Sequence, residues 1–240
     1  MSDERPIVLH AFDHPSDWSF AAARAIKQAL ADDLTQHGSA NLRLSGGTTP
    51  AEVYAALAQQ ALDWSAVTIG LVDERWLQPH EPASNAFLVQ QHMLHSLPQA
   101  HFMPLVRPGL TLDACVATAN EEARRAPLPA VTVLGMGEDG HTASLFPGAV
   151  DLAAVMKNPA VYAAFDATGC AGANQWAQRI TLTPAGIALS SQRFLLIRGQ
   201  RKRDVLEAAL ASTDPHRYPI RLAIDRCGDC GKRLQVFWSA

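Results

Sequence analysis

A glycine-rich run at residues 135–144 contains the residue types that an acid–base reaction needs. Its sequence is Gly-Met-Gly-Glu-Asp-Gly-His-Thr-Ala-Ser, so His141 follows Asp139 by two positions. A histidine side chain can be neutral near pH 7 and accept a proton from water, and a neighbouring carboxylate can fix its tautomer. A lone histidine is more often a structural residue. In this glycine-rich setting we instead predict that His141 is the base of a hydrolytic step and that Asp139 orients it.

The letters of residues 135–140 also match G-x-G-x-x-G, the pattern of dinucleotide-binding turns. Glu138 and Asp139 would place negative charge where a pyrophosphate must bind, and Pro147 interrupts the helix that should carry it. The match lies in mid-chain, and no acidic residue stands at the offset of about 20 residues where a ribose is bound. A nicotinamide enzyme is therefore disfavoured.

Residues 45–50, Ser-Gly-Gly-Thr-Thr-Pro, have the composition of an anion-binding turn. Gly46 and Gly47 let the backbone approach an anion, and the helix that begins near Pro50 offers free N–H groups. Thr48 adds a hydroxyl. An ordinary strand-to-helix turn is the alternative, and the Gly-Lys-Ser/Thr of a Walker A loop is missing.

Charged side chains follow two further expected strands. Asp73 and Arg75 end one strand, and Lys202 lies at the start of a helix after another. Arg179 is a further cation. Solvated strand and helix ends would explain each residue alone, but together these side chains could hold a phosphate by charge-assisted hydrogen bonds. The candidate substrate-binding residues are Gly46, Gly47, Thr48, Asp73, Arg75, Arg179 and Lys202.

The elements that must position these residues alternate between strand and helix. Strands are expected at residues 6–11, 41–44, 66–72, 101–105, 130–134, 160–165, 180–182, 194–197 and 234–238. Helices are expected at residues 16–38, after Pro50, and at 84–95, 112–123 and 201–210. This order predicts an α/β fold with a mostly parallel, Rossmann-like sheet flanked by helices, in one domain over residues 1–240. Ligands bind beyond the carboxyl ends of such strands, so the polar segments should converge on one rim.

Composition narrows the class of protein. The 240 residues carry a net charge of -3, which argues against bulk attraction to nucleic acid or an anionic membrane. No signal peptide and no stretch of roughly 20 apolar residues is visible. Four cysteines without a signal favour a reducing, cytoplasmic setting. Cys227 and Cys230 form a C-x-x-C pair without further metal ligands at recognisable spacing, so we expect no metal site.

The segments together resemble the 6-phosphogluconolactonase family. The matching runs, in family order, are Ser-Gly-Gly-Thr-Thr-Pro at 45–50, Asp-Glu-Arg-Trp at 73–76 with His80 and Ser84-Asn85, the run 135–148, Arg-Ile-Thr-Leu-Thr at 179–183, and Gly199 with Lys202. The resemblance implies a fold shared with sugar-phosphate isomerases and deaminases, and hydrolysis of 6-phosphoglucono-1,5-lactone in the oxidative pentose phosphate pathway without a cofactor. It assigns His141 as the base, and Arg75, Arg179 and Lys202 as cations of the pocket.

Two alternatives remain open beside that resemblance. Glucosamine-6-phosphate deaminases have a similar Asp-Gly-His run, but they carry a glutamate five residues after the histidine, where this chain has Phe146. A sugar-phosphate sensor would carry an N-terminal helix-turn-helix, for which a first strand at about residue 7 leaves no room. The expected partner is a small phosphorylated sugar lactone, bound by a monomer or a small homo-oligomer.

Overall fold

Parallel strands with apolar side chains on both faces form the centre of the molecule. The computed structural model describes residues 6–225 and 232–240. Seven parallel strands lie in the order β1-β10-β9-β6-β2-β3-β5. Their bounds are β1 Ile7–Phe12, β2 Ala40–Leu44, β3 Val67–Leu71, β5 His101–Met103, β6 Val131–Leu134, β9 Gln192–Arg198 and β10 Leu234–Ser239. All residues of the central strands β2 and β6 are buried, as expected for strands covered on both faces.

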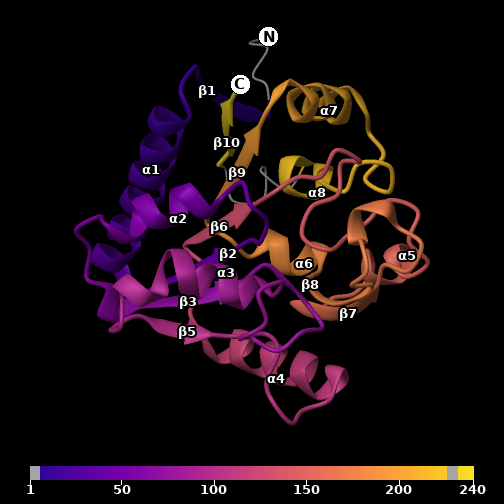
Figure 1. The fold of residues 1–240 in the computed structure, drawn as a ribbon, viewed down its shortest axis with the longest axis horizontal. Coiled ribbons are helices and arrows are strands. Elements are labelled where there is room, and N and C mark those ends of the chain that lie inside the picture. The colour runs from indigo at the N-terminus through magenta and orange to yellow at the C-terminus, as the bar shows by residue number, and fades with distance from the viewer. Residues whose placement is uncertain (1–5, 226–231) are drawn as a thin grey trace.

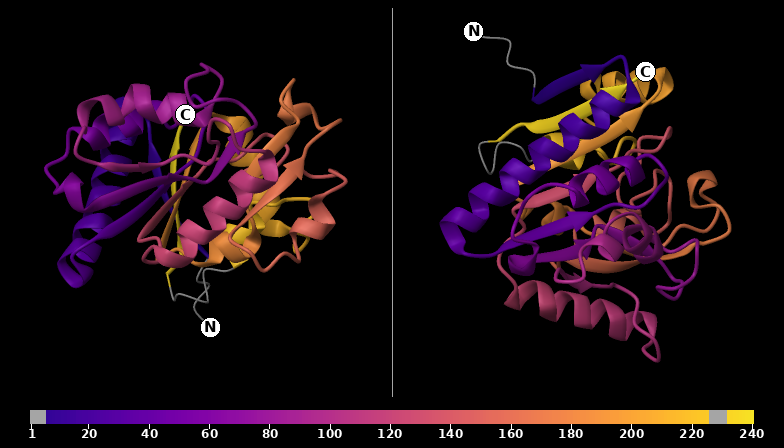
Figure 2. Two further views of the ribbon diagram at one scale, coloured as in Figure 1. Left: turned by 90° about the horizontal axis from the view of Figure 1, so that it is seen from below. Right: turned by 60° about the vertical axis from the view of Figure 1, so that its left-hand side comes forward.

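Helices cover this sheet on both sides (Figures 1 and 2). Their bounds are α1 Pro15–His37, α2 Ala51–Ala58, α3 Asn85–His92, α4 Leu112–Arg125, α5 Leu152–Val155, α6 Pro184–Ala188, α7 Gln200–Ala211 and α8 Arg221–Asp225. Helix α1 packs against α2 and the strands β1, β2, β6, β9 and β10, whereas α7 contacts β9 and α4 contacts β7. In the described part of the chain, no helix combines the length and apolar character needed to cross a membrane.

The sequence determines where the longest helix, α1, begins and ends. Pro15 begins α1, where its missing N–H costs nothing, and Gly38 ends it with a left-handed φ of 75°. The N–H of Gly38 donates to the carbonyl of Leu34. One stripe of small and large apolar residues, from Trp18 to Leu30, is buried against the sheet.

A second, antiparallel sheet was not expected from the sequence. Its three strands are β4 Asp73–Arg75, β8 Gln178–Leu182 and β7 Tyr162–Asp166, in the order β4-β8-β7. Residues 73–75, expected to be a polar end beyond strand 66–72, are therefore a strand of their own. Only Val72 separates β3 from β4. Its N–H donates to the carbonyl of Leu44 on β2, and its carbonyl accepts from the N–H of Leu182 on β8.

The predicted fold class is confirmed, since each strand and helix expected from the sequence is present with ends shifted by a few residues. The sequence did not indicate β4 or the short helices α5, α6 and α8. These elements are too short to show a periodic apolar pattern.

Candidate active site

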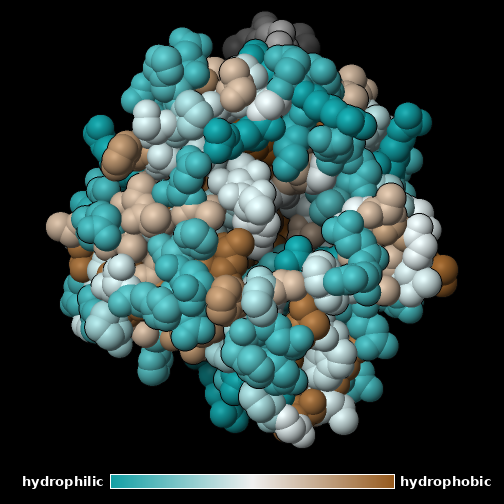
Figure 3. Space-filling model, in the orientation of Figure 1, coloured by the Kyte–Doolittle hydropathy of each residue, from teal (hydrophilic) through white to brown (hydrophobic). Residues whose placement is uncertain are grey.

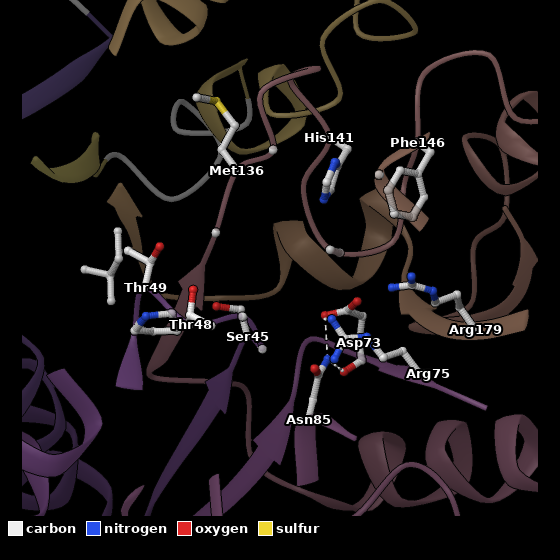
Figure 4. Close-up of a pocket in the computed structure, with 18 of the residues that line it drawn as sticks. Ser45, Thr48, Thr49, Asp73, Arg75, Asn85, Met136, His141, Phe146 and Arg179 are labelled. Carbon is white, nitrogen blue, oxygen red and sulfur yellow. Dashed lines mark hydrogen bonds between the residues drawn. The ribbon is translucent and has the colours of Figure 1, made fainter. Parts of the chain in front are cut away.

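The polar segments that follow β2, β3, β6 and β9 converge on one pocket, as the strand-end rule predicts. The pocket has a volume of about 240 Å³. It opens as a hollow near the centre of the face shown in Figure 3, and its lining is drawn in Figure 4. The lining consists of residues 45–50, Asp73, Arg75, Asn85, residues 135–137, His141, Ala143, Phe146, Gly172, Arg179, Leu196 and Lys202.

Asp139 and His141 form a hydrogen-bonded pair at one side of this pocket. The Nδ1 atom of His141 lies 2.6 Å from Oδ1 of Asp139, which also accepts the backbone N–H of His141 at 3.1 Å. Burial acts to raise the pKa of Asp139, but the hydrogen bonds and the charge interaction with His141 outweigh it, and the pKa lies below its usual value. The ionised carboxylate can only accept, so Nδ1 carries the hydrogen and Nε2 is left as the basic atom.

Two glycines of the loop leave space for neighbouring side chains, and Gly137 leaves it for this pair. A Cβ atom at Gly137 would lie 2.1 Å from Nδ1 of His141 and 2.5 Å from Oδ1 of Asp139. At Gly140, where φ is 83°, it would lie 2.7 Å from the ring of Tyr218. Neighbouring backbone bonds close the turn, because the N–H of Gly137 donates to the carbonyl of His141. The G-x-G-x-x-G run therefore forms the loop that positions His141, and its match to the dinucleotide-binding pattern is misleading.

Phe146 lies beside the imidazole. The ring centroids of His141 and Phe146 are 4.3 Å apart, and Phe146 is only 1% exposed. The guanidinium carbon of Arg179 lies 5.3 Å from the same phenyl ring. An apolar ring thus occupies the position next to His141 and excludes water from that side of the imidazole.

Arg179 contributes positive charge to the pocket more than it contributes free hydrogen-bond donors. Its Nε donates to the carbonyl of Trp176, one terminal nitrogen to the carbonyl of Ala173, and the other reaches Oγ of Ser144 at 3.4 Å. Within the described residues, the guanidinium of Arg75 makes fewer hydrogen bonds than that of Arg179. One terminal nitrogen donates to the carbonyl of Ala83, and within residues 6–225 and 232–240 its Nε has no partner.

Asp73 is held rigidly at the pocket floor, below His141 in Figure 4. The hydroxyl of Ser144 donates to its Oδ2 at 2.5 Å, and the side-chain amide of Asn85 donates to its carbonyl at 2.8 Å. Asn85 also requires a glycine at position 46, since a Cβ atom at Gly46 would lie 1.8 Å from Oδ1 of Asn85. The pocket therefore presents a fixed carboxylate as an acceptor for ligand hydroxyls.

Lys202 lies in the first turn of α7, near the loop 45–50. Burial lowers the pKa of Lys202, and the charge of Glu138 partly opposes that shift. The loop, the start of α2 and the start of α7 together offer backbone N–H groups and one ammonium to an anion.

All the residues expected to bind substrate line the pocket, and Asp139 lies behind His141. Asn85, Ser144 and Phe146 belong to runs that carried the family resemblance, and the fold brings them to the site through contacts between segments that are far apart in sequence. Exposed His80 is not among the lining residues. Cys227 and Cys230 lie outside the described residues. In the part of the chain that the structure describes, no group of three or more His, Cys, Asp or Glu side chains could hold a metal ion.

Comparison with known proteins agrees with this geometry. Residues 13–234 match the family model described as glucosamine-6-phosphate isomerases/6-phosphogluconolactonase. The chain is 50% identical over 239 residues to a 6-phosphogluconolactonase of Xylella fastidiosa strain Temecula1, covering 100% of this chain and 99% of that protein. A crystal structure of a 6-phosphogluconolactonase from Shewanella baltica is 36% identical, with a TM-score of 0.89 and all of both chains covered. A structure from Neisseria gonorrhoeae, described as a putative 6-phosphogluconolactonase, is 30% identical with a TM-score of 0.85, covering 98% of this chain and 100% of that one.

The close approach at Gly137 predicts that Gly137→Ala breaks the hydrogen bond between Asp139 and His141. Nitrogen NMR of the histidine ring should then show loss of the hydrogen-bonded Nδ1–H signal. Gly135→Ala is the matched control, because a Cβ atom there would meet only Oγ of Ser45 at 3.8 Å. A Gly137→Ala protein that keeps the signal would contradict this account of the loop.

Proposed function

The chain belongs to the family of glucosamine-6-phosphate isomerases and 6-phosphogluconolactonases, and we propose that it is a 6-phosphogluconolactonase. It hydrolyses 6-phospho-D-glucono-1,5-lactone to 6-phosphogluconate in the oxidative pentose phosphate pathway. The observation that carries the assignment is the Asp139–His141 pair beside a pocket that is also lined by Lys202 and the glycine loop 45–50, which can hold a phosphate.

His141 acts as the general base. Because Asp139 holds Nδ1 with its hydrogen, Nε2 takes a proton from water as the water oxygen attacks the lactone carbonyl carbon. Asp139 then stabilises the resulting imidazolium. The tetrahedral intermediate collapses by breaking the bond between the carbonyl carbon and the ring oxygen, and the departing ring oxygen takes the proton back from the imidazolium.

The pocket separates the phosphate of the substrate from its uncharged lactone carbonyl. The phosphate lies against Lys202, Thr48 and the N–H groups of the glycine loop, away from the carboxylates. The carbonyl lies beside His141, and Arg75, which lines the same pocket, stabilises the developing oxyanion with its positive charge. Asp73 accepts hydrogen bonds from sugar hydroxyls, which favours a polyhydroxylated ring.

A direct assay on freshly generated 6-phosphogluconolactone tests the assignment, run beside a deaminase assay on glucosamine 6-phosphate. We expect lactone hydrolysis well above the spontaneous rate and no release of ammonia. Phe146 stands where the deaminases have a glutamate, so the proton relay for amine release is incomplete. Ammonia release without lactonase activity would reverse the assignment, and DNA binding without turnover would favour a sensor.

His141→Asn should lower kcat by about a hundredfold or more, because general base catalysis contributes roughly 10²–10⁴-fold. Binding of 6-phosphogluconate, measured by calorimetry, should change little. Exposed His80 provides the control, and His80→Asn should keep the parent rate. Unchanged turnover in His141→Asn would remove the residue from the mechanism.

Lys202→Ala and Arg75→Ala should each weaken binding of 6-phosphogluconate by roughly tenfold or more, because each removes a charge-assisted contact. Arg201→Ala is the matched control, since Arg201 pairs with Glu138 at 3.0 Å and does not line the pocket. Calorimetry measures all three affinities. Equal losses in Lys202→Ala and Arg201→Ala would point to general attraction and not to a phosphate site at Lys202.

A further inference from the structure

Glu74 is a buried carboxylate directly behind the pocket. Side chains alternate along β4, so Asp73 and Arg75 line the pocket while Glu74 points to the opposite face, beneath the start of α3. It is 1% exposed. The mechanism above does not use it, because it cannot reach the substrate.

The contacts of Glu74 connect two walls of the site. Its Oε1 accepts the backbone N–H of Arg75 at 2.9 Å and that of Asn85 at 2.7 Å, and Oε2 accepts the N–H of Ala86 at 2.8 Å. The carboxylate thereby links β4 to the first turn of α3, and we call these three hydrogen bonds the Glu74 clamp. Both Arg75 and Asn85 carry side chains that line the pocket. A shift of this clamp would move the two side chains together.

We propose that Glu74 is a positioning residue whose ionised carboxylate holds Arg75 and Asn85 in the geometry that binds the sugar phosphate. The proposal rests on the proposed function, because the ligand is the phosphorylated sugar acid that the reaction produces. Protonation of Glu74 loosens the clamp, since a protonated carboxyl presents an O–H where an N–H must be accepted.

The surroundings of Glu74 allow this proton to be exchanged near neutral pH. Burial raises the pKa of Glu74 to about 7, although the three N–H groups oppose the shift, and the charge of Asp73 adds to it. Charged neighbours are Asp73 and Arg75 on its own strand and Arg179 on β8, whereas α3 contributes only N–H groups.

As the pH rises, ionisation of Glu74 should have opposite effects on the affinity for the product and on the stability of the fold. The ionised form binds best, so affinity for the product should rise with pH through about 7. The folded state, by contrast, retains a proton that the unfolded chain has already lost, between the ordinary pKa of glutamate and about 7. The contribution of Glu74 to stability therefore falls as pH rises through the same range. A merely structural role would give the same fall in stability but would leave the affinity independent of the protonation of Glu74.

Glu74→Gln tests the proposal with calorimetry of 6-phosphogluconate at about pH 6 and about pH 8. We expect binding about tenfold weaker than in the parent protein at the higher pH, and a difference of only about twofold at the lower pH. Comparing the variant with its parent at each pH cancels the titration of the ligand phosphate. Glu81→Gln is the matched control, because Glu81 accepts one backbone N–H, from Gln78 at 2.5 Å, and does not line the pocket.

A second measurement needs no variant. By linkage, a product that prefers ionised Glu74 must lower the pKa of that carboxyl when it binds. Carbon NMR of glutamate side chains in the parent protein should therefore show the carboxyl that titrates near neutral pH shift to lower pH on adding 6-phosphogluconate. An equal affinity ratio at both pH values, or no shift in the titration, overturns the role of Glu74. A parent protein that neither hydrolyses the lactone nor binds the product overturns the proposed function itself.

Discussion

The site depends on one backbone junction, at Val72. Its N–H bonds to β2 of the parallel sheet and its carbonyl to β8 of the antiparallel sheet, so the chain passes between sheets within a single residue. The hydroxyl of Tyr162 reinforces the junction by donating to the carbonyl of Leu71 at 2.7 Å. This turn carries Asp73 and Arg75 over the carboxyl ends of the parallel strands, where the loops after β2, β6 and β9 already meet. Without this turn, the pocket would keep its anion-binding loop and His141 but would lose the charged side chains of Asp73 and Arg75.

The polar groups of the pocket are fixed before a ligand arrives. Asp139 sets the tautomer of His141, Ser144 and Asn85 hold Asp73, and backbone carbonyls accept hydrogen bonds from two of the three guanidinium nitrogens of Arg179. Such prior arrangement is what electrostatic stabilisation of a transition state requires, because little reorganisation then accompanies the reaction. Phe146 completes the arrangement with an apolar wall where a proton-transferring acid would serve a deaminase.

Much of this architecture was predictable from sequence, for physical reasons that also set the limit. Apolar runs ending in polar segments indicated the parallel sheet and its rim, and the rule for strand ends brought His141, Gly46 and Lys202 together. The three residues of β4 are too few to show an alternating pattern, so the second sheet was missed. Glu74 escaped notice because its partners are backbone N–H groups 11 and 12 positions away, and main-chain donors have no signature in a sequence.

The central claim is that His141 faces the reacting carbon while Lys202 and the glycine loop hold the phosphate. A crystal structure of the protein with 6-phosphogluconate tests this most directly, because the carboxylate carbon of the product was the lactone carbonyl carbon. We predict that this carboxylate lies within hydrogen-bonding distance of Nε2 of His141 and that the phosphate contacts Lys202 and Thr48. A product bound in the reverse direction, with its phosphate against His141, would contradict the account.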